Sequence, residues 1–152
     1  MPGFAVGAHE AFPSVESLLG GRSVLGARSR TRLEWVDMIR QGIPAAAVDS
    51  LLKAIRVSQV DLAKILGIPE RTLARRKRAG TLNSEESAKL LRLARVVGRA
   101  TEVFEDADAA LDWLKAPNSA LARKTPLSLL DTEIGAESVL DTLGRIEHGI
   151  FA

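Results

Sequence analysis

Apolar residues recur every three or four positions along most of this 152-residue chain. That spacing gathers side chains on one face of an α-helix. No segment alternates apolar and polar residues as a half-buried strand does. The breaks in the pattern fall mostly at glycines and prolines, which commonly end and begin helices. The sequence therefore predicts an all-α protein.

Helical periodicity is weak before residue 30, where glycines punctuate the chain. We expect residues 1–29 to form a flexible N-terminal arm, with at most one helical turn over 14–19. A helix is then expected from Thr31 to Gly42. Pro44 is expected to begin the next helix. The apolar spacing of the first is set by Leu33, Val36 and Ile39, and that of the second by Ala46, Val48, Leu51, Leu52 and Ile55.

Residues 57–83 have the pattern of two short helices joined by a tight turn. Ser58 can N-cap the first helix and Gly67 can end it in a left-handed conformation. Pro69 suits the first position of the second, which runs from Glu70 to about Ala79. The first helix is expected to pack through Val60, Leu62, Ala63, Ile65 and Leu66. This pattern is typical of a helix-turn-helix whose second helix enters the DNA major groove; the alternative is an ordinary helical hairpin with a solvated basic face.

The second of these helices is strongly basic, since five of its eight residues from 71 to 78 are Lys or Arg. Leu73 and Ala74 are its main apolar residues. Such a helix should have most of its surface in water or against a polyanion. Arg76 lies near a position where many such motifs bury an apolar residue, and Leu82 is the candidate to replace it.

The longest expected helix begins after Asn83, which with Glu86 matches the spacing of a capping box. It ends near Phe104. Its apolar side is formed by Leu90, Leu91, Leu93, Ala94 and Val97. Arg92, Arg95 and Arg99 line another side, which we interpret as a solvated face; the alternative is contact with phosphates or an acidic partner.

An acidic junction at residues 105–108 marks the expected domain boundary. Beyond it we expect a helix over 108–115 and a turn capped by Asn118. Another helix is expected to begin at Thr125-Pro126, and a last helix is expected to be capped by Asp131 or Thr132. The core stripe of the last helix consists of Ala136, Val139, Leu140, Leu143 and Ile146. The apolar residues after Gly149 either fold back on the core or insert into a partner. The predicted parts are the arm (1–29), a helix-turn-helix DNA-binding and self-association domain (30–105) and a small C-terminal helical domain (106–152).

Charge is unevenly distributed along the chain, although the net charge is only +2. Residues 51–80 hold eight Lys/Arg against two Asp/Glu, whereas residues 126–152 hold one arginine against five acids. This asymmetry suggests different partners for the two regions. The absence of cysteine excludes disulfides and cysteine-based metal sites. With no membrane-length apolar run and no signal pattern, a soluble cytoplasmic protein without membrane contact is expected.

Candidate catalytic groups are sparse. His9 and His148 lie in the arm and near the C-terminus, and the carboxylates form no cluster suited to acid–base or metal chemistry. Gly20-Gly21 lacks the strand and lysine of a phosphate-binding loop, and the serines at 14, 17 and 23 have no visible base. We therefore predict neither enzymatic activity nor a cofactor.

Two stretches resemble the Xre/MbcA/ParS antitoxins, the DNA-binding halves of bacterial RES–Xre toxin–antitoxin pairs. They are GIPERTLARRKRAGTLNSEESAKLLRLARV (67–96) and DWLKAPNSALARKTPLSLLDTEIGAESVLDTLGRIEHGIFA (112–152). The resemblance covers roughly residue 35 onwards and excludes the arm. It implies a cognate RES-domain toxin that consumes NAD, inhibited because the C-terminal domain covers its active site. It also implies self-association as a homodimer or higher assembly and repression of the chain's own operon.

Site residues follow from the resemblance. The groove-facing DNA candidates are Gln59, Arg71, Thr72, Arg75 and Arg76, with Lys77 and Arg78 assigned to phosphates. The residues implied to face the toxin are Gly144, Arg145, Glu147, His148, Gly149, Ile150, Phe151 and Ala152. A single short recognition helix reads few bases, so the operator is expected to be an inverted repeat bound by two or more copies. Two alternatives stay open: a stand-alone transcriptional regulator with a dimerisation or sensing domain, and a toxin-binding protein that no longer binds DNA.

Overall fold

The structure is a computed structural model that describes residues 13–26 and 30–149. In these residues there is no strand, only isolated bridges joining Pro44 to Thr81 and Asn118 to Lys124. The all-α prediction is confirmed. The helices are α1 (Pro13–Leu18), α2 (Gly21–Leu25), α3 (Arg32–Gln41), α4 (Ala46–Ile55), α5 (Gln59–Leu66), α6 (Glu70–Ala79), α7 (Ser84–Phe104), α8 (Ala107–Lys115) and α9 (Glu133–Glu147), with short 3₁₀ helices η2 (Ser119–Leu121) and η3 (Pro126–Leu129).

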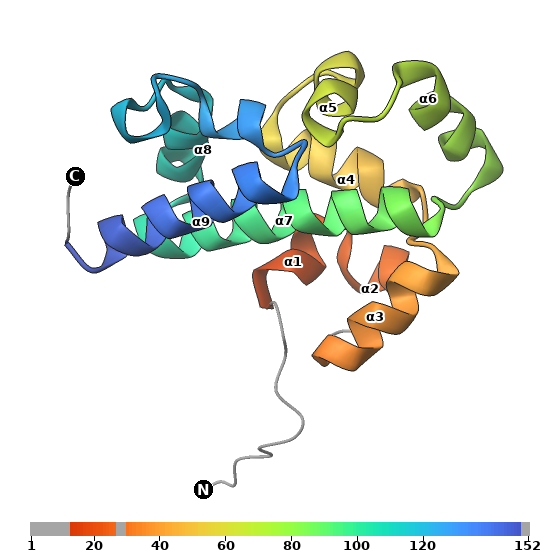
Figure 1. Cartoon of the computed structure of the whole chain (residues 1–152). Helices are drawn as coiled ribbons and strands as arrows, with labels where there is room; N and C mark the ends of the chain where they lie inside the picture. The colour runs from red at the N-terminus through yellow and green to blue at the C-terminus, as the bar shows by residue number, and fades with distance from the viewer. Residues whose placement is uncertain (1–12, 27–29, 150–152) are drawn as a thin grey trace, which may run out of the picture.

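Helix α7 is the axis of the molecule (Figure 1). Its predicted capping box is present: the Asn83 side chain accepts from the Glu86 amide at 2.8 Å, and the Glu86 carboxylate accepts from the Asn83 amide at 2.9 Å. Helices α5 and α6 lie near its N-terminal end, α8 and α9 pack along its C-terminal half, and α1 to α3 lie on its other side. A single long helix therefore contacts both predicted domains.

The helical turn expected over 14–19 is present as α1, but the prediction that residues 13–26 belong to a flexible arm is wrong, because α1 and α2 pack against α4 and α7. Val15, Leu19 and Leu25 are at most 5% exposed. Gly20 and Gly26 take positive φ values of 107° and 82°, so the glycines that suggested flexibility instead act as helix ends. Residues 1–12 lie outside the described residues.

A buried ion pair holds this N-terminal segment in place. The Arg30 guanidinium donates to the Glu16 carboxylate at 3.0 Å, and both side chains are less than 10% exposed. The same guanidinium donates to the Leu25 carbonyl and lies 5.3 Å from the centre of the Trp35 ring. Residue 30 therefore links α1, α2 and α3.

Four residues expected in the core are exposed instead: Leu33 and Val36 on α3, Ala46 on α4 and Val60 on α5. On α3, Leu33 is 76% and Val36 37% exposed, because the helix turns Trp35 inward, with Met38 and Ile39 packed against the core. On α5, Val60 is 50% exposed, whereas Leu62, Ala63 and Leu66 are buried as predicted. Helical spacing predicts which residues share a face. It did not determine which face of α3 and of α5 is turned toward the core.

The buried apolar residues form one cluster that extends from Val15 to Leu143. Leu82, the predicted substitute for an apolar residue on α6, belongs to this cluster and is 2% exposed. The boundary predicted at residues 105–108 falls between α7 and α8, yet the core continues across it. None of the helices in the described part of the chain has the length and apolar character needed to cross a bilayer.

Candidate functional site

Helices α5 and α6 form the predicted helix-turn-helix. The Ser58 hydroxyl caps α5 by accepting from the Asp61 amide at 3.1 Å. Gly67 ends α5 with φ 70°, and Ala63, four residues earlier, is 2% exposed in the helix contact. Pro69 takes the N-cap position of α6, one residue earlier than predicted.

The outward face of α6 carries three cations. Arg71, Arg75 and Arg78 are exposed, and among the described residues none of the three has an ion-pair partner. Leu73, on the opposite face, is fully buried. The helix is therefore anchored by one leucine and presents a positive surface whose charge is available to a polyanion.

The structure separates Arg76 from this outward set. Its Nε donates to Glu86 Oε1 at 2.8 Å, and the Glu86 side chain is 9% exposed. Arg76 therefore compensates a buried carboxylate that is already part of the α7 capping box, which explains why an arginine replaces the apolar residue expected there.

Lys77 and Gln59, also predicted to contact DNA, have partners on α4, α5 and α6. Lys77 Nζ lies 2.6 Å from Gln59 Oε1 and 2.7 Å from Asp49 Oδ1, and Gln59 Nε2 donates to Glu70 Oε2 at 2.8 Å. Thr72 is half-buried. Of the seven predicted DNA-binding residues, the arginines at 71, 75 and 78 have the most accessible side chains.

The second candidate surface is the C-terminal end of α9. Thr132 caps this helix by accepting from the Gly135 amide at 3.0 Å. Three residues of its predicted apolar stripe, Ala136, Val139 and Leu143, are buried in the core. Of the predicted toxin-facing residues, Gly144 is half-buried, and Arg145, Glu147, His148 and Gly149 are exposed. Ile150, Phe151 and Ala152 lie outside the described residues.

Two arginines of α7 attach this last segment to the rest of the molecule. Arg99 Nη1 donates to Glu147 Oε2 at 3.0 Å, with a second bond from Nη2 to Oε1. Arg92 Nε donates to the Leu130 carbonyl at 3.3 Å, and its Nη1 lies 3.5 Å from Glu133 Oε2. The interpretation of a solvated face is therefore wrong for Arg92 and Arg99, while Arg95 is exposed. Their spacing of seven residues was visible in the sequence, but partners 38 and 48 residues away were not.

The Arg99–Glu147 pair predicts a pH dependence. Hydrogen bonding from Arg99 lowers the pKa of Glu147 below its ordinary value of 4.5. A carboxyl group with a lowered pKa in the folded state stabilises that state above pH 4.5, and the contribution is lost as the pH falls through the lowered value. We expect an NMR titration of the Glu147 carboxyl to have a midpoint below 4.5 and to shift upward in Arg99→Ala. The same midpoint in both proteins would show that the pair does not form in solution.

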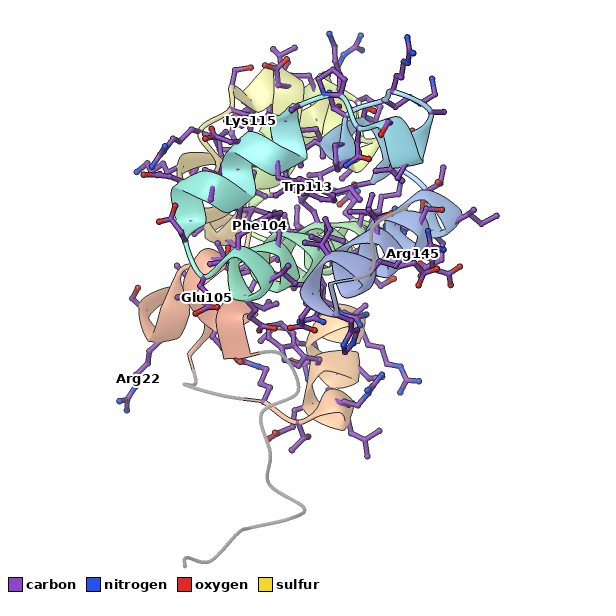
Figure 2. All side chains as sticks on the ribbon, turned by 90° about the vertical axis from the view of Figure 1, so that its left-hand side faces the viewer. Arg22, Phe104, Glu105, Trp113, Lys115 and Arg145 are labelled. Atoms are coloured by element: carbon purple, nitrogen blue, oxygen red, sulfur yellow. The ribbon has the colours of Figure 1, made fainter. Side chains whose placement is uncertain are left out.

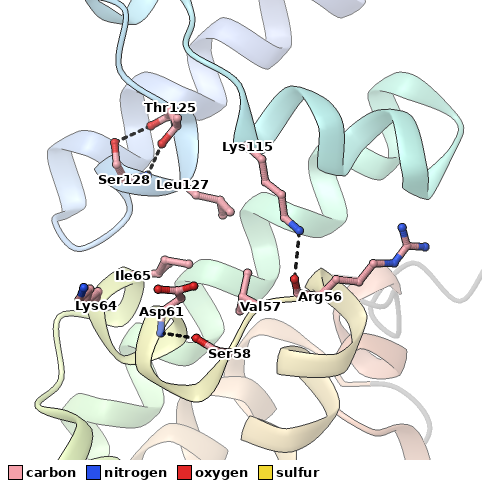
Figure 3. Close-up of a pocket in the computed structure, with 10 residues that line it drawn as sticks. All are labelled: Arg56, Val57, Ser58, Asp61, Lys64, Ile65, Lys115, Thr125, Leu127 and Ser128. Carbon is pink, nitrogen blue, oxygen red and sulfur yellow. Dashed lines mark hydrogen bonds between the residues drawn. The ribbon is translucent and has the colours of Figure 1, made fainter.

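A groove of about 560 Å³ separates α5 from the C-terminal segment (Figure 3). Lys115 Nζ crosses it to the Arg56 carbonyl at 3.2 Å, and the Arg56 guanidinium pairs with Asp108 at 2.7 Å. Beyond the groove, Lys89 donates to the Gly67 carbonyl at 3.2 Å.

Both candidate surfaces are attached to α7. Glu86 holds α6 near one end of α7 and Arg99 holds α9 near the other, about 20 Å apart along the helix axis.

Within the described residues, no group of three or more His, Asp or Glu side chains lies close enough to hold a metal ion. The structure thus presents two candidate surfaces. Its accessible groups are cations on α6 and a mixed polar helix end on α9.

Comparison with known families matches both halves of the chain. The model of the antitoxin Xre-like helix-turn-helix domain matches residues 34–95, and the model of the antitoxin Xre/MbcA/ParS C-terminal toxin-binding domain matches residues 99–149. The two matches cover the helix-turn-helix and the α8–α9 segment, respectively.

Individual relatives agree with these matches. An antitoxin Xre from Yersinia enterocolitica is 36% identical over 119 residues, covering 77% of this chain and 80% of the relative. An antitoxin Xre from Photorhabdus laumondii is 37% identical over 115 residues, covering 74% of this chain and 78% of the relative. In fold, the chain is similar to one chain of the crystal structure of the M. tuberculosis MbcT–MbcA toxin–antitoxin complex. The TM-score is 0.54 at 21% identity, covering 71% of this chain and 96% of that one.

Proposed function

The chain belongs to the Xre antitoxin family, and from that premise we propose that it inhibits a cognate RES-domain toxin and represses its own operon. As an antitoxin it acts by binding, so the NAD-consuming chemistry belongs to the toxin and no cofactor is assigned here. The observation that carries the proposal is the placement of two accessible surfaces near opposite ends of α7. One molecule can therefore hold DNA and toxin without the two competing for the same residues.

The end of α9 is the proposed toxin-binding surface. It lies in the segment matched by the toxin-binding family model. Arg99 fixes Glu147 at the end of the helix while the neighbouring Arg145 and His148 side chains are exposed. This arrangement supports a rigid helix end that covers the entrance to the toxin's active site, with little conformational entropy to lose on binding.

The outward cations of α6 are the proposed DNA-binding surface. Each phosphate neutralised by Arg71, Arg75 or Arg78 releases counterions, so affinity should fall steeply with salt. An arginine that contacts guanine through two hydrogen bonds would add about 1–3 kcal/mol of sequence discrimination. Because α6 spans only ten residues, useful specificity calls for two copies of the chain on an inverted repeat, and we propose a homodimer or higher assembly on the operator.

The test of toxin inhibition is growth and intracellular NAD in a host that expresses the neighbouring RES-domain protein. Co-expression of this chain is expected to restore both, and Arg145→Glu to restore them less well. Arg22→Glu, an exposed charge reversal on α2, is the matched control. Removing residues 126–152 is unsuitable, because Leu127, Leu130, Val139 and Leu143 are buried core residues. A harmless neighbour would leave a stand-alone regulator as the function.

Neighbouring arginines on α6 are expected to behave differently. Arg75→Glu should lower operator affinity at least about tenfold and flatten its salt dependence without lowering the melting temperature, because the side chain is exposed and unpaired. Arg76→Ala should lower the melting temperature, since it leaves the Glu86 carboxylate buried without its cation. Fluorescence anisotropy on operator DNA at several salt concentrations and thermal unfolding measure the two effects. An unchanged salt slope in Arg75→Glu would remove this face of α6 from the DNA interface.

A further inference from the structure

A short loop over residues 118–124 stands beside α9 in the C-terminal segment. The Asn118 side chain caps η2 by accepting from the Ala120 amide at 2.8 Å. The loop is closed by backbone bonds from the Asn118 amide to the Lys124 carbonyl at 3.0 Å and from the Arg123 amide to the Asn118 carbonyl at 2.8 Å. Leu121 is its buried anchor, at 9% exposure. These bonds fix the backbone of the loop, and its residues 122–124 are exposed on the surface.

Two consecutive residues of this loop have left-handed backbone conformations. Ala122 has φ 57° and Arg123 φ 65°. An L-residue other than glycine is destabilised in this region by contact between Cβ and the backbone. In the described residues two other non-glycine residues, Arg56 and Glu105, share this conformation, and both cap an α-helix, as Ala122 caps η2. Arg123 caps no helix, and its exposed side chain has no ion-pair partner in the described part of the chain.

The loop and α9 enclose a groove of about 490 Å³. Its lining includes Ala122 and Lys124 from the loop and Ser138, Asp141 and Arg145 from α9. The lining therefore holds two exposed cations, Lys124 and Arg145, against the one carboxylate of Asp141. The exposed Arg123 is the sequence neighbour of two lining residues, Ala122 and Lys124. This contrasts with residues 126–152 as a whole, which carry five acids and one arginine.

We propose that this groove is part of the toxin-binding surface and accepts an acidic segment of the toxin, with Arg123 as a specificity-determining residue. The inference rests on the proposed function. It extends the toxin interface from the end of α9 to a second element, through Arg145, which belongs to both. Two lining cations with the exposed Arg123 next to them in the loop are complementary to a negatively charged segment. An arginine kept in an unfavourable backbone conformation, with its charge unpaired, is accounted for by a partner that binds it.

Replacing Arg123 by glycine is expected to raise folding stability and to weaken toxin binding, so the two roles of this residue are measured by different readouts. Arg123→Gly removes the strained Cβ and the charge together, so we expect the melting temperature to rise by about 2–4 °C. At the same time the affinity for the toxin should fall about tenfold, because a charged contact is lost. The probe is the purified, catalytically inactive RES-domain toxin, titrated by calorimetry into the full chain.

Glu105→Gly is the matched control. Glu105 is exposed and also left-handed, at φ 56°, but lies at the end of α7, well away from Arg145 (Figure 2). It should raise the melting temperature by a similar amount without changing toxin affinity. The double reversal Arg123→Glu with Lys124→Glu should weaken toxin binding about 100-fold and reduce its salt dependence, with operator affinity unchanged.

The outcomes separate this inference from the function on which it rests. If the wild-type chain binds the toxin and Arg123→Gly binds it equally well, the groove is not part of the interface and only this inference is overturned. If the wild-type chain does not bind the toxin at all, the proposed function is overturned first. A melting temperature that rises in both glycine variants, with affinity lost in Arg123→Gly alone, supports the proposal.

Discussion

Replacing Gly135 by alanine is expected to lower the free energy of unfolding by about 3 kcal/mol or more. Gly135 lies in the first turn of α9, where an added Cβ would be 1.8 Å from the Leu129 carbonyl oxygen and 2.9 Å from the Thr132 hydroxyl oxygen. The closest atom belongs to the backbone, so it cannot rotate away. Either α9 or the η3 segment must move, and a shift of α9 would also displace the Arg99–Glu147 pair and the groove beside Arg145. Urea unfolding measures the loss, and toxin titration measures the consequence for the interface.

The control for this substitution lies in the same helix. An added Cβ at Gly144 would meet no atom within 4 Å. Gly144→Ala should therefore leave folding stability unchanged or raise it by roughly 0.5–1 kcal/mol, since alanine favours the helix. If both alanine variants unfold at the urea concentration of the wild type, the close approach of α9 to residue 129 does not exist in solution.

Removing the Arg30 side chain is the second change with a large expected effect. Arg30→Ala leaves the Glu16 carboxylate in a site less than 10% exposed without its cation, and breaking one partner of a buried pair costs about 3–5 kcal/mol. The substitution also removes the hydrogen bond to the Leu25 carbonyl and the contact with the Trp35 ring. We expect a large drop in the urea midpoint and faster proteolysis of residues 13–26.

Two further variants serve as controls for Arg30→Ala. Arg40→Ala removes an exposed arginine from α3 and should leave stability within about 0.5 kcal/mol of wild type. Adding Glu16→Leu to Arg30→Met should recover much of the loss, because an apolar pair can replace a buried ion pair. If Arg30→Ala unfolds at the wild-type midpoint, residues 13–26 are not docked on the core, and the sequence-based prediction of a flexible arm would stand.

The long helix α7 links these stability predictions to function. It packs against α1 and α3 through one part of its surface and against α8 and α9 through another. Its arginines bind the C-terminal segment, and its capping-box glutamate binds α6. A change that displaces α9 is therefore expected to affect the proposed toxin-binding surface before the proposed DNA-binding surface, because the contacts that hold α6 lie near the other end of the helix.

Much of this fold could be predicted from the sequence, because it depends on interactions between residues close together in the chain. Ser58, Asn83 and Thr125 cap the helices predicted for them, and Gly67 ends α5 in the left-handed conformation. These features depend on residues at most four positions apart, so a single sequence contains all the information they require. The helix-turn-helix and the basic character of α6 follow from the same short-range signals.

Long-range contacts decided the properties that the sequence left open. Arg75 and Arg76 are chemically identical neighbours, and only the position of the Glu86 carboxylate makes one an outward cation and the other a structural partner. Arg99 is paired because α9 returns along α7 and brings Glu147 to it, 48 residues later. Gly135 is required because the Leu129 carbonyl approaches its Cα. Helical periodicity states which residues share a face, whereas the direction of that face, and the partner that each charge finds on it, depend on how distant segments pack.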